Sequence, residues 1–110
     1  MNRIASDLLG VATDLMPRIK GVFEKNPDCE DREYNSINFE IQRFVSTLRA
    51  NENLECFVFR RDDEEKMEIT VGFTDHEAMQ GIIENMCDMF KKIGKKNGIK
   101  VKVEIFDEKR

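Results

Sequence analysis

The strongest constraint on the fold is a change in the spacing of apolar residues near Cys56. Before this residue, apolar side chains recur every three or four positions, which is the spacing of one face of a helix. After it they alternate with polar side chains, as in a strand with one buried face, and one more helical stretch separates the last two alternating segments. In a chain of 110 residues this order of patterns predicts a single α+β domain over residues 1–110.

The N-terminal half predicts two amphipathic helices. Apolar positions in residues 3–25 fall on one helical stripe, and Pro17 is expected to bend this helix without ending it. The stripe consists of Ile4, Leu8, Val11, Ala12, Leu15, Ile19, Val22 and Phe23. A second helix is predicted from residue 35 or 36 to residue 50, and Phe39 falls on its polar side, where we expect an exposed ring.

The C-terminal half predicts a ββαβ unit with a three-stranded, mostly antiparallel sheet. Residues 56–59 are apolar at every position, which is typical of a central strand, whereas residues 66–73 and 99–106 alternate. The acidic stretch 62–65 predicts a hairpin loop. A capping box at Thr74 opens one long helix that Gly94 and Gly98 close. With residues 56–59 in the middle, the expected order of the three strands is 2-1-3, with the helices packed on the sheet.

The net charge of −4 hides a basic region near the C-terminus. Six lysines and no acid lie between residues 91 and 103, and they are Lys91, Lys92, Lys95, Lys96, Lys100 and Lys102. Two of them are explained by the end of a helix, where cations complement the helix dipole. Six exceed that role, so an anionic partner such as a phosphate backbone remains open.

Most catalytic templates are missing from the sequence. The single histidine, His76, lies in a predicted helix cap, and no serine lies in a nucleophile-elbow pattern. Three cysteines at wide spacing form neither a disulfide framework nor a zinc knuckle. The acidic loop 62–65 could hold a divalent cation, but a solvated turn is the simpler interpretation. We therefore expect no catalytic residues, no cofactor and no metal.

The orientation of Phe57 and Phe59 decides what the far face of the sheet can bind. We expect both rings to point inward, because burying two rings is worth a few kcal/mol. If they point outward, the rings and nearby lysines would form a surface of the kind on which single-stranded nucleic acid stacks.

These features predict a non-catalytic regulatory or adaptor module that binds protein and acts as a homodimer. The candidate contact residues are exposed Phe39 and Phe106, together with the six lysines. The alternative is a nucleic-acid-binding domain that uses the lysine-rich region and the sheet, and a metal-assisted hydrolase is a third, weaker hypothesis. No apolar run approaches the roughly 18 residues of a membrane span, and Asp7 and Asp14 interrupt any leader-like stretch. The expected location is the cytoplasm, with no membrane partner.

Overall fold

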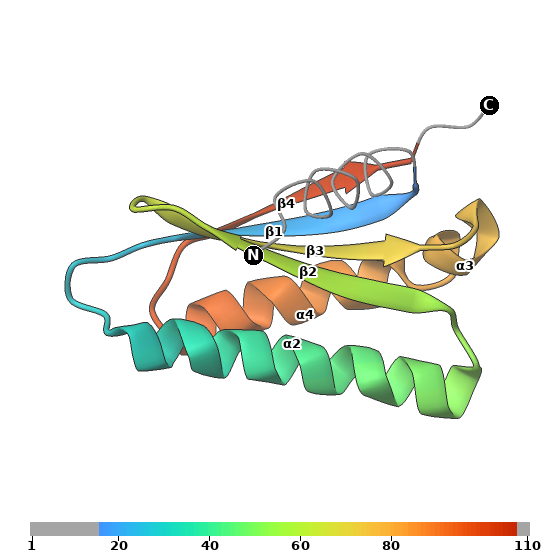
Figure 1. Cartoon of the computed structure of the whole chain (residues 1–110), viewed down its shortest axis with the longest axis horizontal. Helices are drawn as coiled ribbons and strands as arrows, with labels where there is room; N and C mark the ends of the chain where they lie inside the picture. The colour runs from blue at the N-terminus through green and yellow to red at the C-terminus, as the bar shows by residue number, and fades with distance from the viewer. Residues whose placement is uncertain (1–15, 108–110) are drawn as a thin grey trace, which may run out of the picture.

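The computed structural model describes residues 16–107 of the chain (Figure 1). Along the sequence, its elements are β1 (Arg18–Glu24), α2 (Asp31–Glu52), β2 (Cys56–Asp62), β3 (Lys66–Phe73), α3 (His76–Gln80), α4 (Ile83–Lys96) and β4 (Val101–Phe106). The four strands form one sheet in the order β2-β3-β1-β4, and every neighbouring pair is antiparallel.

The two halves of the described chain follow the same plan. The connection through α2 joins β1 to the parallel strand β2, and the connection through α3 and α4 joins β3 to the parallel strand β4. In each case another strand lies between the two that are joined. This βαββαβ order is the split βαβ arrangement known as ferredoxin-like, which hosts many unrelated functions.

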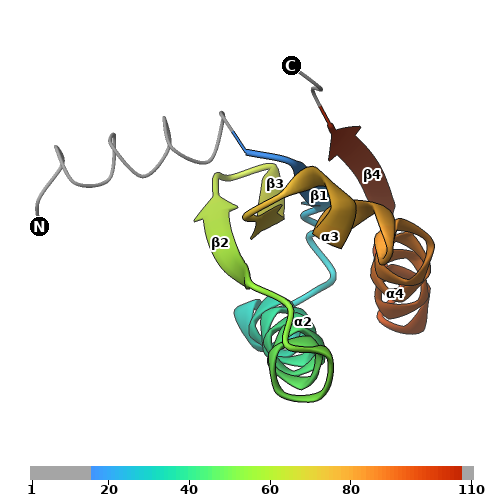
Figure 2. The same ribbon diagram turned by 90° about the vertical axis from the view of Figure 1, so that its right-hand side faces the viewer.

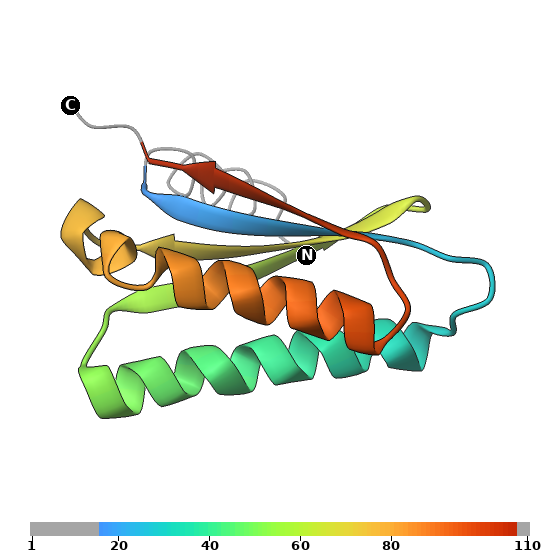
Figure 3. The ribbon, with the colours of Figure 1, turned by 180° about the vertical axis from the view of Figure 1, so that it is seen from behind.

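Both long helices lie on one face of the sheet, side by side (Figures 1 and 3). Seen along the sheet in Figure 2, α2 and α4 lie below the strands, and no described element lies on the opposite face. We call the helix-covered face the inner face and the opposite one the outer face.

The core lies between the inner face and the two long helices. Most of the fully buried side chains come from β1, β3, α2 and α4, and they include Ile19, Phe23, Met67, Ile69, Val71, Ile37, Ile41, Val45, Met86 and Phe90. The rings of Phe23 and Phe90 meet edge to face with centroids 6.0 Å apart. Gly21 makes this contact possible, since a Cβ at Gly21 would lie only 2.6 Å from Cδ1 of Phe90.

The predicted helix over residues 3–25 is wrong for its C-terminal part. Residues 18–24 form β1, the strand that pairs with both β3 and β4, and residues 3–15 lie outside the described range. Ile19 and Phe23 are four residues apart, a spacing that fits a helical stripe and also the same face of a strand. Gly21 lies between them and also faces the core, but it has no apolar side chain. The alternation of apolar and polar residues that would indicate a strand is therefore not visible in residues 18–24.

The predicted sheet of three strands and the predicted two N-terminal helices are therefore both incorrect. The sheet has four strands, and β2, which we expected at its centre, is an edge strand paired only with β3. The chain direction expected for the last strand is correct, because β4 runs parallel to β3, but β1 lies between them. The α+β class and the antiparallel pairing are confirmed.

The helices differ from expectation at their ends. Helix α2 begins at Asp31, several residues earlier than predicted, because Glu30 and Glu33 form a capping box. The predicted third helix is broken into α3 and α4 around Gly81. Its cap is Asp75 instead of Thr74, since the Asp75 carboxylate accepts a hydrogen bond from the Ala78 amide at 2.7 Å. Within residues 16–107 no helix combines the length and apolarity needed to cross a membrane.

Candidate binding face of the sheet

The outer face carries side chains from all four strands. The register places them in rows across β2, β3, β1 and β4, because residues paired across strands point to the same side. The first row is Phe57, Gly72, Arg18 and Phe106, the second is Phe59, Thr70, Lys20 and Glu104, and the third is Arg61, Glu68, Val22 and Lys102. The face is therefore aromatic at the end where β1 begins and charged further along.

Phe57 and Phe59 form the aromatic edge of this face. They are two residues apart on β2, and their rings meet edge to face with centroids 5.4 Å apart. Phe57 lies over Gly72, where a Cβ would come within 2.7 Å of its Cε2 atom. Since glycine has no side chain, the ring can lie across β3, and it stays partly exposed to solvent.

Phe106 forms the opposite edge of the aromatic row. The guanidinium of Arg18 lies 4.2 Å from the centre of the Phe106 ring, and the ammonium of Lys20 lies 5.4 Å from it. Both distances fall within the range of cation–π contacts. The first row thus carries one ring at each edge of the sheet, with Phe57 against Gly72 and Phe106 against Arg18.

The rest of the face is a mixture of charges with more basic than acidic groups. Lys20 and Lys66 both contact Glu68, at 3.4 and 3.2 Å, and Lys102 lies 3.8 Å from Glu104. Desolvation would raise the pKa of Glu68, but the hydrogen bonds and charges of Lys66 and Lys20 outweigh it and hold the pKa below its ordinary value. These carboxylates are thus paired, while Arg61 adds a further positive charge.

The expected inward orientation of Phe57 and Phe59 is wrong. Cys56 and Val58 point toward α2 and the core, and the two rings point to the outer face. The apolar run 56–59 thus reflects aromatic groups on an otherwise open face, not a central position in the sheet. The sequence left the outward orientation of the two rings open as an alternative, but it could not predict that β2 lies at the edge of the sheet.

The six lysines do not form one surface. Lys91, Lys92, Lys95 and Lys96 lie on α4, which covers the inner face, whereas the register places Lys102 on the outer face. Lys100 precedes β4, and its carbonyl accepts a hydrogen bond from the amide of Glu24. Lys96 also bonds Glu40 of α2 at 2.8 Å, which ties the two long helices together. Only part of the predicted basic region is therefore available to any one ligand.

Phe39 and Phe106 likewise lie on different elements. Phe39 on α2 is 62% exposed, as expected, and the Arg43 guanidinium lies 5.9 Å from its ring centre. Phe106 is on β4 and belongs to the outer face. One partner surface that covers both rings would have to span two sides of the domain, so we treat the outer face as the candidate site.

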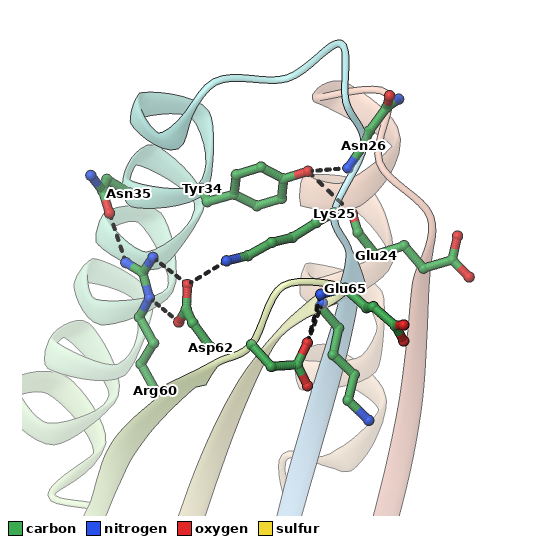
Figure 4. A network of polar contacts seen from close by, with 10 residues as sticks. Glu24, Lys25, Asn26, Tyr34, Asn35, Arg60, Asp62 and Glu65 are labelled. Carbon is green, nitrogen blue, oxygen red and sulfur yellow. Dashed lines mark hydrogen bonds and ion pairs between the residues drawn. The ribbon is translucent and has the colours of Figure 1, made fainter.

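The acidic loop 62–65 is held by contacts within the chain (Figure 4). Arg60 forms two hydrogen bonds to the Asp62 carboxylate, at 2.7 and 2.9 Å, and a third to Asn35 of α2 at 2.8 Å. Asp63 accepts from the amides of Glu65 and Lys66 at 2.7 and 2.8 Å. Arg60 and the backbone amides therefore lower the pKa values of Asp62 and Asp63, respectively. Among the described residues, no three potential metal ligands cluster.

The single histidine links the two ends of the second half. His76 of α3 contacts the Asp107 carboxylate through Nδ1, and the side-chain amide of Gln80 donates to the same carboxylate. These contacts tie the residue after β4 to α3. We interpret these contacts as structural, because they hold the end of β4 against α3.

Comparison with known proteins adds little to this description. No family model matches the chain, and no curated protein matches it. Among solved structures, the de novo designed protein Foldit4 is similar over 86% of this chain and 98% of its own, with 17% sequence identity and a TM-score of 0.44. A likeness of this size supports no inference about function.

Proposed function

We propose that the chain is a non-catalytic binding module that docks protein through the outer face of its sheet, with a second copy of the chain as the partner. The observation that carries the proposal is the outward orientation of Phe57, Phe59 and Phe106 on a face that no described helix covers. Aromatic rings are enriched at the centres of protein interfaces, where they contribute much of the binding energy.

Packing of one outer face on another follows the usual geometry of paired sheets. Two sheets stack about 10 Å apart with their strands roughly aligned. A two-fold axis parallel to the strands would place β2 of one copy over β4 of the other, so that Phe57 would lie over Phe106 in both halves. Each copy would thus contribute the same aromatic row to the interface.

The size of the face predicts a weak, reversible dimer. Four strands of about seven residues present roughly 440 Å² of projected area, from the standard strand spacing and rise. Stable interfaces bury about 800 Å² on each partner, and smaller ones belong to transient complexes. We therefore expect association at micromolar and not nanomolar concentrations.

Light scattering coupled to size-exclusion chromatography tests this proposal. The dimer fraction of the chain should rise with concentration and fall in the variant Phe57→Ser with Phe59→Ser. The matched control is Phe39→Ser, which removes an exposed ring from α2 and should leave association unchanged. A chain that stays monomeric at every concentration, or a dimer that only Phe39→Ser disrupts, would contradict the proposal.

Single-stranded nucleic acid is the second candidate ligand. The specific observation in its favour is that Phe57 and Phe59 share the outer face with Arg18, Lys20 and Arg61, since stacked bases and backbone phosphates need rings and cations together. The net charge of −4 opposes this ligand, because the body of the molecule would repel phosphates.

Salt distinguishes the two candidates by the sign of its effect. Binding to a short oligothymidylate strand should weaken as salt rises, because the strand releases counterions when it binds. Self-association should strengthen, because salt screens the repulsion between two copies of equal charge. Fluorescence anisotropy with labelled oligothymidylate, repeated with Lys20→Glu and Arg61→Glu, completes the comparison.

A further inference from the structure

We propose that the free edge of β4 pairs with β4 of a second copy, antiparallel, so that the sheets of the two copies join into one. This contact goes beyond the proposed function, because it uses an edge of the sheet and not its outer face. Three features of β4 support it: the direction of its backbone groups, the apolar side chains beside them, and the order of charges along the strand.

The backbone of β4 presents hydrogen-bonding groups on the side away from β1. Among the described residues, β4 pairs with β1 alone. The amide of Glu24 donates to the carbonyl of Lys100 at 3.0 Å, which continues the register of this pair of strands. Hydrogen-bonded and non-bonded pairs alternate in an antiparallel ladder, so the even-numbered residues of β4 bond β1. The N–H and C=O groups of Val101, Val103 and Ile105 therefore point to the free edge.

The side chains of the same three residues make this edge apolar. The register places them on the inner face, opposite residues 19–23 of β1. Val101 and Val103 pack against the core but stay partly exposed, and Ile105 is 46% exposed. A strand edge with unpaired backbone groups and exposed apolar side chains is a template for pairing with another chain.

The opposite edge of the sheet, formed by β2 (Figure 2), is better protected. The amide of Thr74 bonds the carbonyl of Glu55, so the even-numbered residues of β2 face away from β3. Arg49 of α2 already donates to the carbonyl of Cys56 at 2.7 Å. Further along, Arg60 places a charged side chain on the inner side of this edge, which is a common protection against strand pairing. Strand addition is therefore favoured at β4.

The order of charges along β4 selects one register. A two-fold axis perpendicular to the sheet makes the two strands antiparallel and keeps the helices of both copies on one side. With this axis at Val103, Lys102 of each copy lies opposite Glu104 of the other, and opposite charges in directly opposed positions stabilise a pair of strands. An axis at residue 102 would place Lys102 opposite itself, and an axis at residue 104 would place Glu104 opposite itself.

The same register also brings the apolar side chains together. Val103 lies opposite Val103 of the second copy, and Val101 lies opposite Ile105 on either side of it. Each of these three pairs exchanges two backbone hydrogen bonds, about six in all. The side chain of Lys102 is 76% exposed and lies 3.8 Å from Glu104 of its own chain, a long contact that it can exchange for one across the interface.

Hydrogen exchange tests the backbone contact directly. The chain carries Phe57→Ser with Phe59→Ser, which removes the aromatic edge of the outer face, and sedimentation velocity gives the dimer fraction. When half of the chains are dimeric, the three odd-numbered amides of β4 should exchange about twofold more slowly than in dilute solution, because only the monomer exposes them. The amide of Val58 on the β2 edge is the control and should exchange equally fast at both concentrations.

Charge reversal in the same background tests the register. Lys102→Glu and Glu104→Lys each place like charges opposite one another twice in the pair, so each should weaken association about tenfold. A one-to-one mixture of these two variants restores opposite charges at every position and should associate like the parent. The double variant Lys102→Glu with Glu104→Lys should do the same. Arg61→Glu on β2 makes the same change of charge as Lys102→Glu and should change association less than about twofold.

Four results would overturn the inference. The chain could stay monomeric at about 1 mM, or its dimers could leave the three β4 amides unprotected. The amide of Val58 could be the one that slows. The mixture of the two reversed variants could associate no better than either alone, although its recovery is the result that also shows both variants to be folded.

Failure of this inference differs from failure of the proposed function. Dimers of the parent that vanish with Phe57→Ser and Phe59→Ser, without protection of the β4 amides, retain the outer face and reject the edge. Association that these two serines leave unchanged, with the β4 amides protected, retains the edge and rejects the outer face.

Discussion

The guanidinium carbon of Arg18 lies 4.2 Å from the centre of the Phe106 ring, and the two residues are direct partners in the pairing of β1 with β4. On the outer face, the contact links the inner strand β1 to the edge strand β4. It also leaves the ring of Phe106 shielded on the side that Arg18 occupies. The relationship therefore matters for the stability of β4 and for the shape of the candidate docking surface.

A double-mutant cycle should detect coupling between these two residues. We expect Arg18→Ala and Phe106→Ala to be non-additive by about 0.5–1 kcal/mol, the usual size of a partly exposed cation–π contact. Urea unfolding of the parent, both single variants and the double variant measures the coupling. Strict additivity would show that the ring and the guanidinium are neighbours without a favourable interaction.

The substitutions Gly21→Ala and Gly72→Ala should lower the stability of the fold by different amounts. At Gly21 the new Cβ would lie 2.6 Å from the ring of fully buried Phe90, and we expect a loss of about 1–3 kcal/mol from overpacking. At Gly72 the Cβ would meet the ring of Phe57 at 2.7 Å, but that ring can swing toward solvent. The loss for Gly72→Ala should therefore be smaller. Thermal unfolding of the two variants provides the comparison, and equal losses would argue that Phe57 is held as tightly as Phe90.

Removing the hydroxyl of Tyr34 should destabilise the loop between β1 and α2. The hydroxyl accepts a hydrogen bond from the amide of Asn26 at 2.6 Å and donates one to the carbonyl of Glu24 at 3.3 Å (Figure 4). In Tyr34→Phe both backbone groups lose this partner, at a cost of about 1–2 kcal/mol. Chemical unfolding measures the loss, and hydrogen exchange at Asn26 should quicken. A protected Asn26 amide in the variant would show that another group replaces the hydroxyl.

The Asp62 carboxylate should make a small part of the stability depend on pH. Arg60, through its hydrogen bonds, and Lys25 hold the pKa of Asp62 below its ordinary value of 3.8. A lowered pKa means that the contribution is fully present above the unfolded pKa and is lost as pH falls through the folded pKa. Because both side chains of the Arg60–Asp62 pair remain partly exposed to solvent, we expect only about 0.2–1 kcal/mol.

Urea unfolding at pH 7 and at pH 3 tests this expectation. The stability difference between the parent and Asp62→Asn should be present at pH 7 and shrink on acidification. Glu64→Gln removes one charge from the same loop and serves as the control. A difference that grows toward low pH would reverse the assigned sign.

Several features of the fold could be predicted from local patterns. The periodicity of residues 35–50, 66–73 and 99–106 predicted most of α2, β3 and β4, because each pattern is consistent with a single period. The hairpin at the acidic loop and the exposed ring of Phe39 were also predicted correctly. The outward position of Phe106 followed from its parity along the last strand.

The sequence by itself thus determined which segments are amphipathic and with which period, since this information lies in neighbouring residues. Only the tertiary structure decided that residues 18–24 are a strand, because Ile19 and Phe23 satisfy both periods and the choice depends on pairing with β3 and β4. It also decided that β2 is an edge strand with Phe57 and Phe59 outward. Strand order and the choice of covered face depend on contacts between residues far apart in the chain, and periodicity carries no information about such contacts.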